Sequence, residues 1–123
     1  MLKSLIPIAG LFSTVIATQL YVSAFSGTIT VLDLHKQGGK NNFELSTLTV
    51  DHTAPRNTSF LLFDEEKDIL YSTEEGADVP NGFVSSYKTS SSGALEQISR
   101  IPNINGDVHQ ALYNGGKSLA VPH

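Results

Sequence analysis

Glutamate and histidine side chains near the ends of predicted strands are the residues of this chain best suited to acid–base chemistry. Glu75 follows an apolar segment that ends near residue 73, and His109 stands near the start of another, between Val108 and Gln110. A carboxylate and an imidazole at one site can share the work of moving a proton to and from a substrate. A plainer interpretation competes, because adjacent glutamates such as Glu74 and Glu75 are usually solvated and a histidine within a strand is usually packed.

Other common kinds of site have no support in the sequence. There is no cysteine, no His-x-His pair and no Glu-x-x-His pair on a helix, so we expect no metal ion. Neither a glycine-rich phosphate loop nor a Gly-x-Ser-x-Gly elbow is present, and we expect no cofactor. His35 and His52 follow polar residues of predicted loops, and we assign them no role. Asn57-Thr58-Ser59 fits the acceptor pattern for N-glycosylation.

The first residues have the composition of a secretory signal. Lys3 provides a positive charge, an apolar run follows, and the run ends in small or modest side chains at Ala17. This run is shorter than the about 20 residues that a membrane-spanning helix needs. We therefore predict a signal peptide over residues 1–17, with an uncleaved anchor as the alternative, and a secreted protein that leaves the membrane after cleavage.

The charge of the chain restricts its partners. A net charge of −4 and only 8 lysine and arginine residues, which do not cluster, argue against a nucleic-acid or anionic-membrane partner. An exported domain of this size without cysteine has no disulfide to stabilise it. Its stability must come from packing, from the solubility that glycosylation provides, or from more protein than this chain contains.

Short apolar or alternating segments separated by Gly, Asn, Asp and Ser predict an all-β chain, because no helical periodicity follows the signal. The predicted strands cover residues 19–24, 28–34, 43–50, 59–63, 69–73, 83–88, 95–100, 108–113 and 118–121.

An internal repeat organises these strands. Leu20-Tyr21-Val22-Ser23 recurs as Leu70-Tyr71-Ser72-Thr73 about 50 residues later, and Leu119-Ala120-Val121 follows after a similar interval. Each repeat holds four short strands, which is what one blade of a β-propeller requires. We therefore predict a partial propeller over residues 18–123, about two blades of an expected seven. The first blade lacks its innermost strand, and the last stops after two strands. A complete β-sandwich or open barrel is the alternative.

At these residues the sequence resembles the lactonase family of seven-bladed propellers, which includes 6-phosphogluconolactonases and fungal carboxymuconate cyclases. The resemblance covers nearly all of the chain after the signal, and it depends on the order of segments rather than on one specific motif. Those segments are 20–29, 54–61, 70–76, 81–87 and 106–123. The family often has proline where this chain has Thr58.

The resemblance implies an enzyme that acts on a small carboxylated lactone or its open acid. Glu75 and His109 match family positions that face the central channel, so they are the candidate catalytic residues. The family's proposed catalytic residues otherwise lie in later blades, which implies that this chain is inactive without the missing C-terminal blades. A secreted propeller or β-domain that binds a ligand or protein without turnover is the alternative function.

Overall fold

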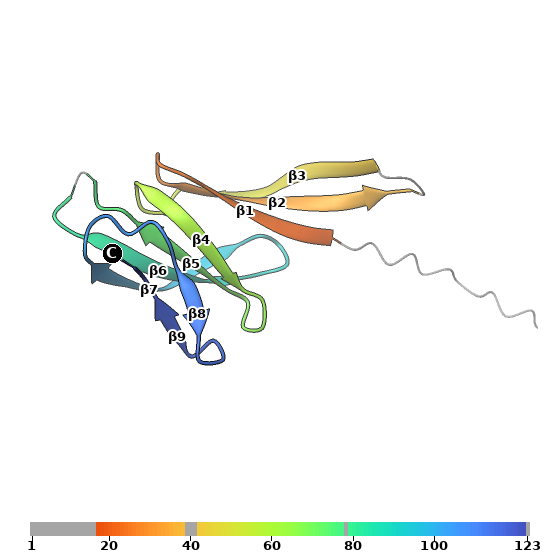
Figure 1. Ribbon diagram of the computed structural model, residues 1–123. Helices are drawn as coiled ribbons and strands as arrows, with labels where there is room; N and C mark the ends of the chain where they lie inside the picture. Colours follow the sequence, from red (N-terminus) through yellow and green to blue (C-terminus); the bar gives the residue numbers. More distant parts are fainter. Residues whose placement is uncertain (1–16, 39–41, 78, 123) are drawn as a thin grey trace, which may run out of the picture.

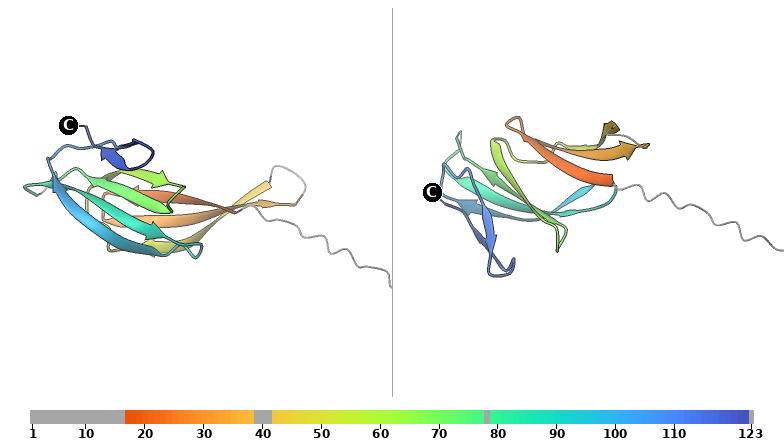
Figure 2. Two further views of the ribbon diagram at one scale, coloured as in Figure 1. Left: turned by 90° about the horizontal axis from the view of Figure 1, so that it is seen from below. Right: turned by 45° about the vertical axis from the view of Figure 1, so that its right-hand side comes forward.

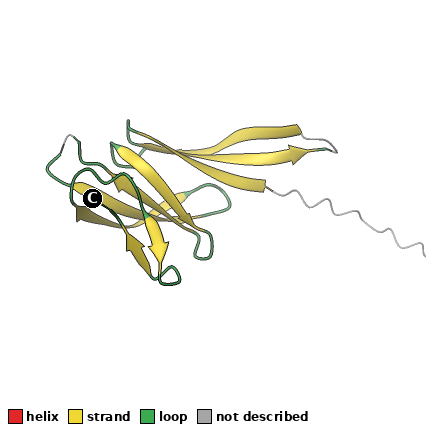
Figure 3. Cartoon of the chain, in the orientation of Figure 1, coloured by secondary structure: helices red, strands yellow, loops and turns green. Residues whose placement is uncertain are grey.

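The computed structural model describes residues 17–38, 42–77 and 79–122, and this part of the chain contains strands but no helix (Figures 1 and 3). The predicted all-β class is thereby confirmed. The strands are β1 (Ala17–Ala24), β2 (Thr28–Gln37), β3 (Asn42–Asp51), β4 (Thr58–Asp64), β5 (Ile69–Glu74), β6 (Gly82–Thr89), β7 (Leu95–Asn103), β8 (Ala111–Tyr113) and β9 (Ser118–Ala120).

These strands form three open antiparallel sheets, each built from strands that follow one another in the chain. The first sheet has the order β1-β2-β3, the second β4-β5-β6-β7 and the third β8-β9. β1 of the first sheet lies against β4 of the second (Figure 1). The sheets therefore divide the chain at the boundaries of the predicted repeat.

Tight turns join the strands within each sheet. Gly27 has a φ of 95° and donates its N–H to the Ala24 carbonyl at 3.0 Å, which closes the turn between β1 and β2. A side chain at this position would be strained because the left-handed region favours glycine. Gly93, with a φ of 83°, closes the turn between β6 and β7 in the same way, by donating its N–H to the Ser90 carbonyl at 3.0 Å. A Cβ at Gly93 would lie 2.8 Å from the Leu48 Cβ of β3. The second sheet therefore approaches the first closely at this loop.

The first and second sheets lie face to face (Figure 2), and the main core lies between them. Ile29 of β2, Leu70 of β5 and Tyr87 of β6 are almost fully buried, together with Ala54 of the loop that joins the two sheets. The alternation of side chains along a strand explains this pattern, since the strand register places Leu70 opposite Tyr87 on one face of the second sheet. Three partly buried side chains complete the cluster, namely Tyr21, Leu61 and Leu95.

The opposite face of the first sheet is apolar but exposed. The register places Leu20 beside Leu32 and Val50 beside Thr30, on the side away from Ile29. Val22 and Leu45 share this side and are 50% and 54% exposed. We call the surface formed by Leu20, Val22, Phe43, Leu45 and Val50 the outer apolar face.

Each of the nine predicted strands overlaps an observed strand, and three of them differ from the prediction by three residues at one end. β2 ends at Gln37 instead of residue 34, and β7 ends at Asn103 instead of residue 100. The predicted strand 108–113 begins only at Ala111, because Gln110 donates a side-chain hydrogen bond to Thr73 Oγ1 and Asp107 accepts one from Asn103. Residues 1–16 of the predicted signal peptide lie outside the described residues, and Ala17 is the first residue of β1. No helix in the described ranges is long and apolar enough to cross a membrane.

Candidate functional site

Three loops meet at one end of the second sheet. They join β3 to β4, β5 to β6, and β7 to β8, and an antiparallel meander places all three at the same end. Backbone hydrogen bonds connect them. The Glu75 N–H donates to the Asn57 carbonyl at 3.1 Å, and the Gly106 N–H donates to the Glu75 carbonyl at 2.9 Å. Glu75 is therefore the point at which the three loops are tied together.

Both predicted catalytic residues lie at this loop end. Glu75 is half-buried directly after β5, whereas His109 is exposed in the loop before β8. The His109 ring contacts the Phe60 ring edge-on, with centroids 4.4 Å apart. No hydrogen bond or ion pair joins Glu75 to His109 in the part of the chain that the structure describes. Their shared catalytic role remains a prediction.

An ion pair between a buried carboxylate and a partly exposed guanidinium group, which the sequence did not reveal, lies beside Glu75. Glu74 is the last residue of β5 and is 3% exposed. The Arg100 side chain of β7 donates from Nε to Glu74 Oε1 at 2.9 Å and from Nη2 to Oε2 at 2.8 Å. Its guanidinium carbon lies 3.8 Å from the centre of the Phe83 ring, which adds a cation–π contact. Two hydrogen bonds and one cation–π contact thus fix the position of the Arg100 guanidinium group.

The hydrogen bonds to Glu74 act on the pKa of Arg100. The two bonds to Glu74 raise the pKa of Arg100, and partial burial opposes them. The guanidinium group is therefore charged at every physiological pH. Glu74 can be buried because its two charge-assisted hydrogen bonds with Arg100 offset the cost of removing its carboxylate from water.

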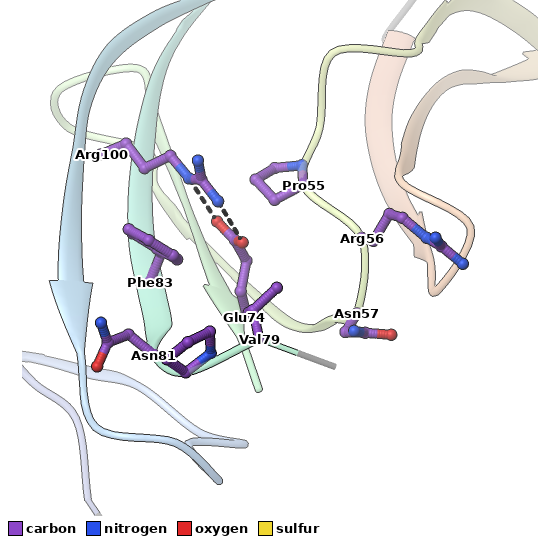
Figure 4. Close-up of a pocket in the computed structure, with 9 residues that line it drawn as sticks. Pro55, Arg56, Asn57, Glu74, Val79, Asn81, Phe83 and Arg100 are labelled. Atoms are coloured by element: carbon purple, nitrogen blue, oxygen red, sulfur yellow. Dashed lines mark hydrogen bonds and ion pairs between the residues drawn. The ribbon is translucent and has the colours of Figure 1, made fainter. Parts of the chain in front are cut away.

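Arg100 and Glu74 line a pocket of about 540 Å³ between the second sheet and the 52–57 loop. Figure 4 shows the ion pair and Phe83 on one wall, with Pro55 and Asn57 on the other. The Arg56 side chain extends away from the ion pair, and its Cγ lies close to Gly27 in the β1–β2 turn (Figure 4). The remaining lining residues are Val79, Pro80 and Asn81.

The lining determines which ligands suit the pocket. The ion pair and two amide side chains provide polar groups, and Pro55, Val79 and Phe83 provide apolar surface. The described residues contain no group of three or more histidine, aspartate or glutamate side chains that could hold a metal ion. The groups that line the pocket can form hydrogen bonds, charge pairs and apolar contacts.

Asn57, the predicted glycosylation residue, forms part of the pocket wall. Its φ of 63° is in the left-handed region, which asparagine tolerates better than most residues. Ser59, the third residue of the acceptor pattern, donates its hydroxyl to the Asp107 carbonyl at 3.3 Å. A glycan on Asn57 would start at the pocket mouth. Its presence remains a prediction.

Sequence reasoning missed Arg100 because the pairing depends on strand register. Glu74 lies opposite Phe83, whereas Arg100 lies opposite Ser85, one position further along the same face. The small Ser85 side chain leaves room for the arginine to cross β6 toward Glu74. A register shift between Ser86 and Tyr87 sets this alignment, and the sequence has no turn motif that marks it.

Comparisons with protein-family models, curated proteins and solved structures found no match for this chain.

Proposed function

We propose that this chain is the N-terminal part of a secreted, lactonase-like β-propeller that acts on a small carboxylated lactone or on its open acid. The observation that carries the proposal is the pocket in which Glu74 holds Arg100 at the loop end of the second sheet. Glu75 and His109, the residues that the family resemblance suggests, lie at the same end.

The arrangement of strands supports a propeller. The second sheet is a four-stranded antiparallel meander, which is the architecture of one blade. The first sheet has three strands and the third has two, so each would need further strands to make a blade. Blades of a propeller cover one another's faces. The outer apolar face of the first sheet fits a position against such a neighbour.

The hydrogen bonds of Arg100 support carboxylate binding. A guanidinium group has five N–H donors, and Glu74 accepts from only two nitrogen atoms, so donors remain for a ligand. Arginine pairs with carboxylates in a planar, two-point geometry. Because Glu74 and Phe83 already fix the guanidinium position, a ligand carboxylate would lose less freedom on binding. The apolar lining residues suit the carbon atoms of a lactone ring.

The proposed reaction assigns the proton transfers to the neighbouring residues. In lactone hydrolysis, water attacks the ester carbonyl carbon while a base takes its proton, and the ring C–O bond then breaks. In the cyclisation direction, a carboxylate adds to a carbon–carbon double bond and a proton is delivered to the adjacent carbon. Glu75 and His109 are the groups that we expect to take and return these protons.

A titration with 5-oxotetrahydrofuran-2-carboxylate, a small carboxylated γ-lactone, tests the binding step by NMR. We expect saturable shifts at the loop end of the second sheet, and Arg100→Gln should weaken binding about 10- to 100-fold, because hydrogen bonds to charged groups contribute about 1.5–3 kcal/mol. Glu74→Gln should retain binding or strengthen it, because it removes the negative charge that competes for Arg100.

Lys88→Gln is the matched control, because Lys88 is an exposed cation at the other end of the same sheet. If circular dichroism shows that the wild type and Arg100→Gln are both folded, and both bind the lactone with equal affinity, then the pocket does not hold the carboxylate. Binding without ring opening by the complete protein would instead favour a propeller that binds its ligand without turnover.

A further inference from the structure

A serine, a histidine and an aspartate lie in line on the β2–β3 hairpin, far from the Arg100 pocket. Asp33 and His35 are two residues apart on β2 and share a face, and Ser46 on β3 is the register partner of Asp33. His35 Nδ1 is 3.2 Å from Asp33 Oδ2, and His35 Nε2 is 3.4 Å from Ser46 Oγ. One imidazole thus joins a carboxylate to a hydroxyl group.

The two contacts together assign the roles of the ring nitrogens. An ionised carboxylate only accepts hydrogen bonds, so Nδ1 carries the hydrogen and donates it to Asp33. Nε2 then has a free electron pair and accepts from the Ser46 hydroxyl. This is the order of nucleophile, base and orienting group found in serine hydrolases on unrelated folds. A distance of 3.4 Å is long, but such contacts are often loose before substrate binds.

A cavity lies beyond Asp33, on the β1 side of the hairpin, and Asp33, His35 and Ser46 are not among its lining residues. Gln19 of β1 is the register partner of Asp33 on the side away from Ser46. It lines this cavity of about 720 Å³ with Tyr21, Phe63 and residues of the two loops at that end of the second sheet. Two strand spacings place the Gln19 and Ser46 backbones about 10 Å apart with Asp33 between them, so an ester that contacts both the cavity and Ser46 must extend across Asp33.

The wall formed by Gln19 is held in place. Its Nε2 donates to the carbonyls of Ser90 and Ser91 at 3.0 and 3.1 Å, and its Oε1 accepts from the Tyr21 hydroxyl at 2.9 Å. A fixed wall of this kind can orient a substrate without reorganising.

The charges around the cavity favour a neutral ligand. Asp33 and Glu44 flank His35 on the hairpin, and Glu65 and Asp68 lie at the cavity rim. These carboxylates would repel an anionic substrate, whereas the rings of Tyr21 and Phe63 provide apolar surface. This site therefore differs in ligand chemistry from the pocket at Arg100.

We propose that Ser46, His35 and Asp33 form a hydrolytic site for small, neutral carboxylic esters. The Ser46 oxygen bonds to the ester carbonyl carbon while its proton passes to His35 Nε2. The bond to the alcohol oxygen then breaks, and the alcohol leaves with that proton. Water attacks the resulting acyl-serine in the same way, which releases the acid and restores Ser46. Asp33 is a positioning residue, because it acts through His35.

The hairpin also offers hydrogen-bond donors for the oxyanion that forms in this reaction. β3 is an outer strand of its sheet, and an outer strand leaves every second backbone N–H without a strand partner. An unpaired N–H therefore lies at Ser46 or at its neighbours in the chain. Donors of this type stabilise the charge that develops on the carbonyl oxygen.

The test uses the full chain with a fluorophosphonate probe and p-nitrophenyl acetate. We expect one phosphonyl adduct, located at Ser46 by peptide mass spectrometry, and its loss in Ser46→Ala. His35→Gln should slow labelling and ester hydrolysis about 100-fold or more, the usual contribution of a general base. For Asp33→Asn, ¹⁵N NMR of the imidazole should show that the hydrogen is no longer confined to Nδ1, together with slower labelling.

Ser26 and His52 are exposed residues outside the constellation and outside the cavity lining. Ser26→Ala and His52→Gln are therefore the matched controls, and both variants should be labelled at the wild-type rate. Absence of an adduct at Ser46 in wild-type protein whose amide spectrum shows folded sheets would overturn the proposal. Equal hydrolysis by wild type and Ser46→Ala would overturn it as well. Because Arg100 takes no part in this reaction, the result does not depend on the carboxylate pocket.

Discussion

The first and second sheets have similar apolar strands but differ in how many faces are covered. The second sheet has a neighbour on each face. β1 and β2 pack against Leu70 and Tyr87 on one face, and the segment before β8 contacts Phe60 and Thr73 on the other. The first sheet has a neighbour on only one face among the described residues. Its outer apolar face is consequently exposed, with Leu45 54% accessible against 1% for Leu70.

This difference shows that burial in the chain depends on neighbouring sheets rather than on the strand sequences themselves. Leu20-Tyr21-Val22 and Leu70-Tyr71-Ser72 occupy corresponding places in the repeat, yet Leu20 is 39% exposed and Leu70 is buried. A stack of repeated sheets buries a continuous core only where another unit follows. The outer apolar face therefore marks the side at which a further sheet is expected.

The comparison is sharpest for two leucines, one on each sheet. Leu70→Ala should lower the free energy of unfolding by about 2–5 kcal/mol, because it removes a buried side chain and leaves a cavity. Leu45→Ala should change it by less than about 0.5 kcal/mol, because an exposed side chain loses little contact. Urea unfolding followed by circular dichroism, at protein concentrations low enough to keep the chain monomeric, measures both. A loss of similar size in the two variants would mean that Leu45 is covered within the monomer.

The pH dependence of the free energy of unfolding should distinguish the buried Tyr87 from the exposed Tyr113, with an effect smaller than that of Leu70→Ala. Burial raises the pKa of Tyr87 above its usual value of about 10, and the carboxylates of Asp51 and Glu74 act in the same direction, whereas Ser72 and Ser85 lower it. The neutral phenol is thus favoured in the folded state. This contribution to stability is present below pH about 10 and is lost as the pH rises through the folded-state pKa.

Unfolding experiments in a pH series can isolate that contribution. Tyr87→Phe should make the free energy of unfolding fall less steeply above pH about 10 than in the wild type. Tyr113→Phe is the control, because Tyr113 is 57% exposed, and its slope should equal that of the wild type. Equal slopes for all three proteins would show that the Tyr87 hydroxyl is not buried.

Local patterns predicted the strands well because each apolar run is bounded by turn residues such as Gly27 and Gly93. They failed at β8, where Gln110 is buried by a side-chain bond to Thr73 instead of joining a strand. They also could not reveal the Arg100–Glu74 pair, since its members are 26 residues apart and meet only through the register across β6. The Asp33, His35 and Ser46 constellation has the same origin, because the pairing of β2 with β3 brings Ser46 beside Asp33.

Sedimentation velocity of the purified chain tests the central claim, that the outer apolar face belongs against another sheet. We predict that the wild type self-associates and that lysine substitutions at Val22 and Leu45, which are exposed on that face, shift it toward the monomer. A wild-type chain that stays monomeric at high concentration and unfolds in a single cooperative transition would contradict the account.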